Sequence, residues 1–184
     1  EKFFNRFGKK TSDYYELERL DPSYRIYYGA HDFMDLPAGV EPLCILFESL
    51  EPGSSKKLLQ FLEEGKYKYE VGVNELVYKP GTSISELLDF KLMAGVFKLH
   101  VFQSISQHVR KFFTNQRIIQ LLEFPVLFLG ATAQKTPALY SLMNYADMVL
   151  GTWYPMGGMF KIIEGMASLA IELGVEIKLN QEVE

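Results

Sequence analysis

The sequence lacks several features that mark secreted, membrane-spanning or repetitive proteins. It contains a single cysteine, Cys44, which excludes an internal disulfide and favours a reducing compartment. No apolar run approaches the ~18 residues that a membrane-spanning helix needs. The closest run, Phe124–Gly130, is short and interrupted by Pro125. No internal repeat, low-complexity segment or signal-peptide pattern is visible, so the sequence indicates an ordinary folded domain.

The charge balance argues against nucleic-acid binding. The net charge of the 184 residues is −4, and no basic patch stands out along the chain. With 48% hydrophobic and 23% charged residues, the composition is typical of a folded domain with one sizeable core. Because the chain opens at Glu1 within a helical pattern, we expect it to be a piece of a longer protein.

Strand-type patterns lie near both ends of the chain, and helical patterns lie between them. Tyr14–Leu20, Tyr24–Tyr28 and Phe33–Leu36 are rich in strand formers and are separated by turn residues. From Gly39 the apolar residues recur at helical spacing. We therefore predict a small sheet from residues 14–36 and 150–184, with a helical block over residues 40–149.

Two long helical patterns lie within the block. One is predicted from Ser55 to about Tyr78, and Leu87–Phe113 forms either one bent helix or two. His100 and His108 fall within the second pattern, and on one helix they would be separated by roughly 80°. Because no third ligand type clusters with them in the sequence, no metal site is predicted.

The C-terminal stretch reads as strand, glycine turn, helix and strand. Thr152–Tyr154 favours a strand, and Gly157-Gly158 permits a tight turn that a ligand can approach closely. A helix is expected from Met159, with Gly174 as its C-cap, followed by a strand over 175–184. The whole pattern predicts an α+β fold in which helices pack mainly on one face of a small mixed sheet.

Four stretches together resemble one enzyme family. They are W-Y-P-M-G-G-M with the helix and strand that follow, Leu20–Arg25, Glu51–Ser54 and Pro137–Tyr145. In this order they resemble the FAD-dependent carotenoid desaturases of the phytoene dehydrogenase type, and the resemblance covers nearly the whole chain. It implies that residues 1–184 are a fragment that forms the substrate-binding domain. In the family this domain is inserted between two halves of a Rossmann-type FAD domain, which we expect to lie outside this chain.

The resemblance also implies a function for the longer protein. Such an enzyme introduces C=C bonds into a long polyene such as phytoene and passes a formal hydride to FAD. We expect this chain alone neither to retain FAD nor to be active. The resemblance places Gly157, Gly158 and Val183 at the cofactor, and Tyr27, Trp153, Tyr154 and Met156 along the substrate cavity.

Glu86 is a candidate acid–base residue with a competing structural interpretation. Many bacterial desaturases carry an Arg-Asp pair on this loop, and Ser85-Glu86 are the matching positions here. The arginine is missing, so only the carboxylate is retained. Ser83 and Glu86 also have the spacing of a helix capping box, which needs no catalytic role.

An insoluble polyene substrate implies contact with a membrane surface. We expect a cytoplasmic, peripheral location, with apolar contact through Phe112-Phe113 or Phe124–Leu129. Burial of these residues in the core is the competing interpretation. Strand edges exposed in the isolated fragment would also favour self-association.

Two alternatives remain open from the sequence alone. A related flavoenzyme could act on another isoprenoid lipid, as a hydroxycarotenoid desaturase or a retinol saturase does. In a different class, the chain could be a non-enzymatic domain that binds lipid or partner helices. The length of the cavity and the polar groups at its end would distinguish these functions.

Overall fold

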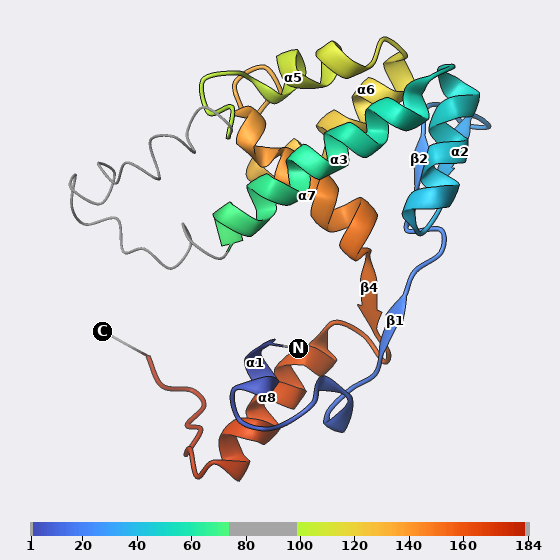
Figure 1. Ribbon diagram of the computed structural model, residues 1–184. Coiled ribbons are helices and arrows are strands. Elements are labelled where there is room, and N and C mark those ends of the chain that lie inside the picture. Colours follow the sequence, from blue (N-terminus) through green and yellow to red (C-terminus); the bar gives the residue numbers. More distant parts are fainter. Residues whose placement is uncertain (1, 74–98, 183–184) are drawn as a thin grey trace. The chain divides into compact units, whose positions relative to one another are not determined.

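A computed structural model describes residues 2–73 and 99–182, and the chain divides into two compact units (Figure 1). Unit 1 combines residues 1–20 with residues 152–184, and unit 2 contains residues 21–151. Among the described residues, no helix is long and apolar enough to cross a membrane. Both units contain helices and short strands, so the predicted α+β class is confirmed.

Unit 1 brings the two ends of the chain into one small sheet. Strand β1 pairs with β4 in antiparallel register, with Leu17 opposite Pro155 and Arg19 opposite Trp153. The pairing confirms that residues near both ends contribute strands to a common sheet. The elements of this unit are α1 (Lys2–Asn5), η1 (Thr11–Asp13), β1 (Leu17–Arg19), β4 (Trp153–Pro155) and α8 (Phe160–Glu172).

The N-terminal segment of unit 1 packs tightly on α8. At Gly165 an added Cβ would lie 3.0 Å from the Cβ of Tyr14 and 3.1 Å from the ring of Tyr15, so only glycine allows this approach. Phe4 is buried and stacks on Tyr14, with 4.8 Å between ring centroids. The carboxylate of Glu172 accepts a hydrogen bond from the Tyr14 hydroxyl at 3.1 Å. These contacts hold residues 1–20 against the helix.

The predicted strand after α8 is wrong for the residues that the structure describes. Helix α8 ends at Glu172, and Gly174 has a left-handed φ of 84°, as expected of a C-cap. Residues 175–182 then form no strand, although their apolar and polar residues alternate. A strand needs a neighbour to accept its hydrogen bonds, and no described residue pairs with this segment. Alternation of apolar and polar residues is therefore not sufficient to form a strand here.

Unit 2 consists of one hairpin and a block of helices. The hairpin pairs Tyr24 with Leu36 and Tyr27 with Phe33. Its elements are β2 (Tyr24–Tyr27), β3 (Phe33–Leu36), α2 (Val40–Leu50), α3 (Ser54–Val71), α5 (Ile105–Phe112), α6 (Gln116–Glu123), η4 (Phe124–Leu129), η5 (Ala138–Ser141), α7 (Leu142–Tyr145) and η6 (Ala146–Leu150).

The single mixed sheet of the prediction is replaced by two antiparallel pairs among the described residues. Strand β1 pairs only with β4, whereas β2 pairs only with β3. The Asp21-Pro22-Ser23 turn separates β1 from β2 and divides what the sequence suggested was one meander. The strands are present, but their choice of partners differs from the prediction.

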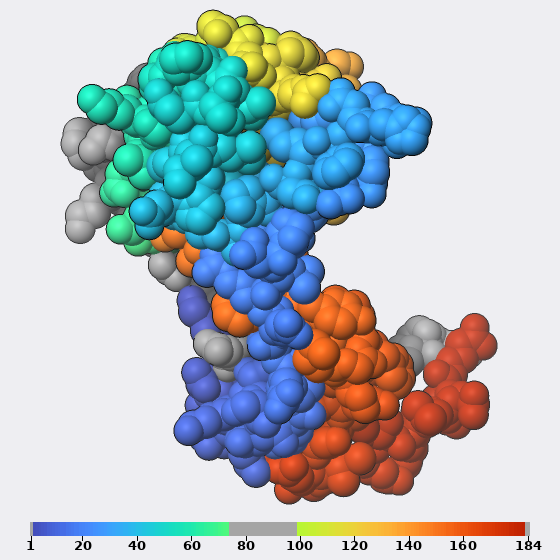
Figure 2. Space-filling model, turned by 90° about the vertical axis from the view of Figure 1, so that its right-hand side faces the viewer, coloured from blue at the N-terminus to red at the C-terminus, as the bar shows by residue number. Residues whose placement is uncertain are grey.

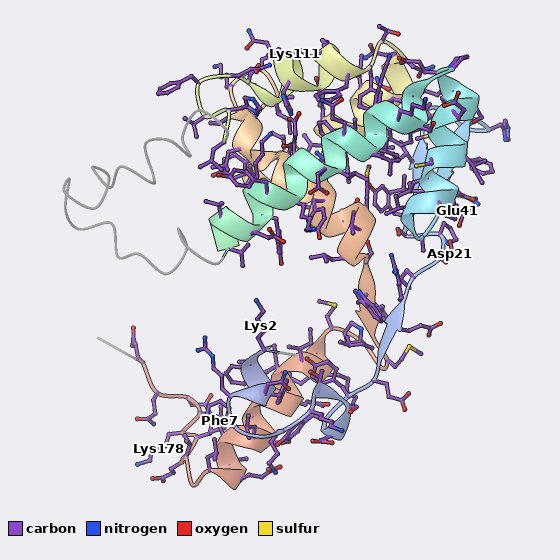
Figure 3. All side chains as sticks on the ribbon, viewed as in Figure 1. Lys2, Phe7, Asp21, Glu41, Lys111 and Lys178 are labelled. Atoms are coloured by element: carbon purple, nitrogen blue, oxygen red, sulfur yellow. The ribbon has the colours of Figure 1, made fainter. Side chains whose placement is uncertain are left out.

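Helix α3 is the central helix of unit 2. It lies beside α2 on one face of the unit (Figure 2), and Leu58, Phe61 and Leu62 point from it into the core. Side chains from α2, α3, α5 and α6 meet in this interior (Figure 3). The helix begins one residue before the predicted start and is described to Val71, while the predicted end at Tyr78 lies outside the described residues.

A buried lysine joins α3 to η5. Lys68 is fully buried, and its ammonium donates hydrogen bonds to the hydroxyl of Ser141 at 2.9 Å and to the carbonyl of Ala138 at 3.2 Å. Gly65 allows the approach, because its Cβ would lie 3.2 Å from both the Ser141 carbonyl and the Cβ of Tyr145. Burial lowers the pKa of Lys68 to about 8.

Glu51 clamps the end of α2 to the start of α6. Its Oε2 accepts hydrogen bonds from the backbone N–H groups of Thr114 and Asn115, each at 2.8 Å, and its Oε1 is 2.9 Å from the ammonium of Lys57. Asn115 returns a hydrogen bond from its side-chain nitrogen to the carbonyl of Leu50 at 2.8 Å. The side-chain oxygen of Asn115 also caps α6. Two chain junctions are thus fixed by one carboxylate and one amide.

We expect Glu51→Gln to destabilise the protein in a pH-dependent way. Burial opposes ionisation, but the backbone donors and Lys57 outweigh it and lower the pKa of Glu51 from 4.5 to about 2. The charged form therefore stabilises the fold above pH 4.5, and this contribution is lost as the pH falls towards 2. At pH 7 the variant should lose about 1–3 kcal/mol in urea unfolding.

The control is Glu63→Gln, which removes an exposed carboxylate from α3. It should change stability by less than about 0.5 kcal/mol. The difference between wild type and Glu51→Gln should shrink as the pH falls from 4.5 towards 2. A difference that stays constant over this range would contradict the depressed pKa.

Candidate functional site

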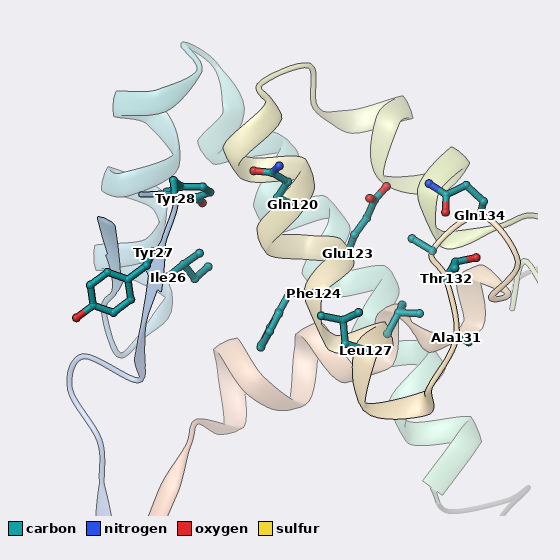
Figure 4. A pocket seen from close by; sticks show the side chains of 12 residues that line it. Ile26, Tyr27, Tyr28, Gln120, Glu123, Phe124, Leu127, Ala131, Thr132 and Gln134 are labelled. Carbon is teal, nitrogen blue, oxygen red and sulfur yellow. The ribbon is translucent and has the colours of Figure 1, made fainter. Parts of the chain in front are cut away.

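A pocket of about 580 Å³ opens in unit 2 between β2, α6 and the segment that follows η4 (Figure 4). This volume lies within the range of sites for small ligands. Its apolar lining includes Ile26, Phe124, Leu127 and Ala131, and its polar lining includes Gln120, Thr132 and Gln134. The pocket can therefore hold an apolar molecule and offer hydrogen bonds at selected points.

Local sequence signals shape the wall of this pocket. Asn115 fixes the start of α6, which continues directly into η4 with Pro125 in its first turn. Gly130 then adopts a left-handed φ of 64° and ends η4, with its N–H bonded to the carbonyl of Leu127 at 3.0 Å. The reversal brings residues 131–134 back to the pocket. One continuous stretch thus supplies most of the wall.

Tyr24 supports the aromatic side of the pocket from beneath. Its hydroxyl donates a 2.7 Å hydrogen bond to Asp147, and its ring centroid lies 5.8 Å from that of Phe124. Burial raises the pKa of Tyr24 well above its ordinary value, and the adjacent Asp147 carboxylate raises it further. The hydroxyl therefore stays protonated and keeps donating, which fixes the ring against Phe124.

Tyr28 presents a buried hydroxyl without a hydrogen-bond partner among the described residues. Its ring lies under the Arg117 guanidinium, 4.8 Å from the ring centroid, and Arg117 is held by Asp32 at 2.7 Å. Burial also raises the pKa of Tyr28. Tyr28 lines the pocket, but its hydroxyl is buried and is not open to a ligand there.

Apolar side chains of η4 extend from the pocket to the surface. Leu127 is 66% exposed and Phe128 is 74% exposed, whereas Val126 is buried. Of the other run considered for membrane contact, Phe113 is only 1% exposed and packs against Phe47 and Phe61. Core burial is therefore correct for Phe113, and of the two runs, η4 is the one with largely exposed apolar side chains.

The predicted site residues are divided between the two units. Unit 1 places Trp153 and Tyr154 on β4, and Met156 with Gly157 and Gly158 on the turn that follows, with the three larger side chains exposed. Tyr27 belongs to unit 2, where it lines the pocket. Glu86 and Val183 lie outside the described residues.

The glycine turn of unit 1 fits a close approach by a ligand. Gly157 and Gly158 have φ values of 87° and 105°, which strongly favour glycine. A Cβ added at Gly158 would meet only the Tyr154 hydroxyl, at 3.9 Å, so its backbone faces open space. At Gly157 a Cβ would lie 3.1 Å from the side chain of Lys161. Gly157 is exposed and Gly158 is partly buried.

The prediction that nothing gathers around the two central histidines is wrong. His100 lies in a turn before α5 with a φ of 51°, not on one long helix with His108, and their ring centroids are 4.9 Å apart. Glu64 of α3 joins them, so the three possible ligand atoms all lie within 4.8 Å of one another. Burial, and then Lys68, lowers the pKa of His108 to about 3.

Sequence reasoning missed the polar lining of the pocket. Gln120 lies on α6, whereas Thr132 and Gln134 lie after Gly130, and no residue pattern joins the two stretches. The available signal was Gly130 itself, since a glycine after a short apolar run indicates a reversal that brings flanking residues together.

A search of known protein-family models finds no match.

Comparison with known proteins gives similarity along the whole chain. A carotenoid 3,4-desaturase of Haloarcula japonica is 34% identical over 100% of this chain, which spans 37% of that protein. A 4,4'-diapophytoene desaturase (4,4'-diaponeurosporene-forming) of Staphylococcus aureus is 30% identical over 98% of the chain and 36% of its own length. A zeta-carotene-forming phytoene desaturase of Myxococcus xanthus is 29% identical over 100% of the chain and 36% of its own length. The chain thus spans just over a third of these relatives.

Replacement of either tyrosine by phenylalanine tests the two roles assigned to hydroxyl groups at the pocket. Tyr24→Phe should lower stability by about 1–2 kcal/mol, because it removes the 2.7 Å hydrogen bond to the part-buried Asp147. Tyr28→Phe is the matched control and should be neutral or slightly stabilising, since it removes a hydroxyl without a partner among the described residues. Urea unfolding at pH 7 measures the stability of both variants. Equal losses of stability would contradict the different roles assigned to the two hydroxyl groups.

Proposed function

We propose that this chain, whose resemblance to the carotenoid desaturases is confirmed over its whole length, is the substrate-binding domain of an FAD-dependent enzyme. The enzyme desaturates phytoene or a related carotenoid. The observation that carries the proposal is that 98–100% of the chain aligns, at 29–34% identity, with three proteins named as desaturases of such polyenes. Residues 1–184 form this domain, and the FAD-binding halves belong to the longer protein.

The pocket of unit 2 supports an isoprenoid ligand. Ile26, Phe124 and Leu127 offer an apolar surface, and burial of a hydrocarbon there contributes about 25 cal/mol for each Å² removed from water. Tyr27, predicted to line the cavity, lies at this pocket. Desaturation demands mainly orientation of the substrate and exclusion of water from the protein, and the apolar lining of this pocket contributes to the first.

The glycine turn of unit 1 is the proposed contact to FAD. Gly157 and Gly158 would hold it through their backbone, with Val183 as a further expected contact, while Trp153, Tyr154 and Met156 line the substrate path. When bound, FAD supplies the acceptor for the hydride that leaves the substrate as a C=C bond forms. A proton leaves the neighbouring carbon, and Glu86 is the candidate to receive it.

The exposed part of η4 supports a peripheral membrane location. Leu127 and Phe128 are largely exposed and adjoin the pocket, so a polyene could pass from the bilayer to the pocket without crossing water. Each large apolar side chain transferred from water to lipid contributes about 1.5–3 kcal/mol. We place the enzyme at the cytoplasmic face of the membrane.

A related substrate class has one observation in its favour. Gln120, Thr132 and Gln134 give the pocket more polar groups than a pure hydrocarbon needs. A hydroxylated carotenoid or a retinol-like lipid would use them. The second candidate is therefore a flavoenzyme that acts on such an isoprenoid.

The function is tested on the full-length protein that contains this chain. A visible absorption spectrum of the purified protein should show bound flavin, and incubation with phytoene in liposomes and added FAD should produce a new polyene spectrum. Bound flavin without formation of a polyene product would indicate that the substrate is a hydroxylated isoprenoid instead. Absence of flavin from the purified protein would contradict the proposed enzymatic function and would favour a non-enzymatic lipid-binding domain.

Membrane contact through η4 is tested by placing charge on its exposed side chains. The double variant Leu127→Asp and Phe128→Asp should reduce co-sedimentation of the full-length protein with liposomes by about tenfold or more, because charged groups enter the bilayer at high cost. Ile45→Asp on α2 is the matched control, since Ile45 is 68% exposed and Leu127 is 66% exposed. Equal losses in both variants would contradict a contact specific to η4.

A further inference from the structure

A second cavity in unit 2, of about 410 Å³, is not used by the proposed function. Three of its lining residues come from separate parts of the chain: Glu64 lies on α3, His108 lies on α5, and His100 lies in the turn before α5. His108 is buried, and the other two are partly buried. Two imidazoles and one carboxylate therefore converge on one cavity.

One distance in this cluster matches that between two ligands of a bound transition metal. The Nε2 of His108 is 3.3 Å from the Oε2 of Glu64, and one ligand atom from each of the three residues lies within 4.8 Å of the others. With metal–ligand bonds of about 2.0–2.1 Å, two ligands of a tetrahedral ion are about 3.3 Å apart. One ion can reach both atoms without a large movement of either side chain.

The cluster also has unused hydrogen-bonding atoms. Oε2 of Glu64, which faces Nε2 of His108, is buried and forms no hydrogen bond with the described residues, and neither does the buried Nδ1 of His100. Such atoms are uncommon in folded proteins and call for a partner. In addition, His100 holds a left-handed φ of 51°, which non-glycine residues adopt seldom and which directs its ring to this cluster.

We propose that Glu64, His100 and His108 bind a divalent transition-metal ion of the Zn²⁺ type. Two histidines and one glutamate form a known ligand set for this ion, and water from the cavity would complete the coordination. The ion would tie α3 to α5 and fix the turn that carries His100. The proposal rests on these side chains and is independent of the desaturase function.

Nearby lysines decide how strongly such an ion is held. Lys68 lies 3.3 Å from the Nε2 of His108, and its positive charge opposes the ion. Lys68 keeps its hydrogen bonds to Ser141 and Ala138 when the ion takes the histidine nitrogen. The cavity is also lined by Lys57 and Lys111, but Lys57 pairs with Glu51, and Lys111 donates to Gln103 at 2.8 Å. Lys68 is therefore the principal competitor.

The experiment uses full-length protein without an affinity tag, stripped of metal with a chelator and titrated with Co²⁺. We expect one Co²⁺ for each chain, visible as d–d absorption that Zn²⁺ displaces. Glu64→Gln and His100→Asn should each weaken binding by more than the roughly 10- to 100-fold caused by loss of an outer partner. Asparagine is chosen because it tolerates the left-handed backbone at position 100.

The matched control is His31→Asn, which removes the exposed third histidine and should leave binding unchanged. Lys68→Met should tighten binding, because it removes the competing charge. The proposal is overturned if wild type binds no Co²⁺, if His31→Asn weakens binding as much as His100→Asn, or if Lys68→Met binds no tighter. Flavin content and polyene formation are measured on the same samples, so failure of the metal site is distinguished from failure of the enzyme.

Discussion

Much of unit 2 depends on the hydrogen bonds that the carboxylate of Glu51 accepts from the backbone at the start of α6. Chain junctions normally leave backbone N–H groups exposed to water, but here two of them are satisfied by a side chain from another junction. The reciprocal bond from Asn115 to Leu50 makes the link two-sided. Because α6 starts at this point and continues into η4, the clamp also determines where the pocket wall lies.

Polar groups, not only apolar packing, specify the interior of unit 2. Lys68 is buried and donates a hydrogen bond to Ser141 of η5, Tyr24 donates one to Asp147, and Glu51 accepts two from backbone N–H groups. Each such group costs free energy unless its partners are in place, so an alternative packing that misplaced a partner would be penalised. The apolar cluster around α3 supplies the drive for folding, and these contacts select one arrangement of it.

Local features of this fold could be predicted from the sequence, and non-local ones could not. The strand Phe33–Leu36 and the C-cap Gly174 follow from residue type and period, which act over a few residues. Partner choice among strands and the convergence of Glu64 with His100 depend on contacts between distant residues. The separation of roughly 80° between His100 and His108 applies only if both lie on one helix, and the turn at His100 excludes that case. The family resemblance supplied the candidate function, whereas the pocket needed three-dimensional structure.

The reversal at Gly130 has a consequence for how the pocket can diversify. Most of the pocket wall comes from residues 120–134, with β2 as the other contributor. A short exchange of coding sequence between related genes would therefore replace nearly a whole wall at once, while the clamp at Glu51 and the core around α3 stayed in place. Ligand preference in such a protein can change by recombination of the coding sequence for residues 120–134, without many separate substitutions.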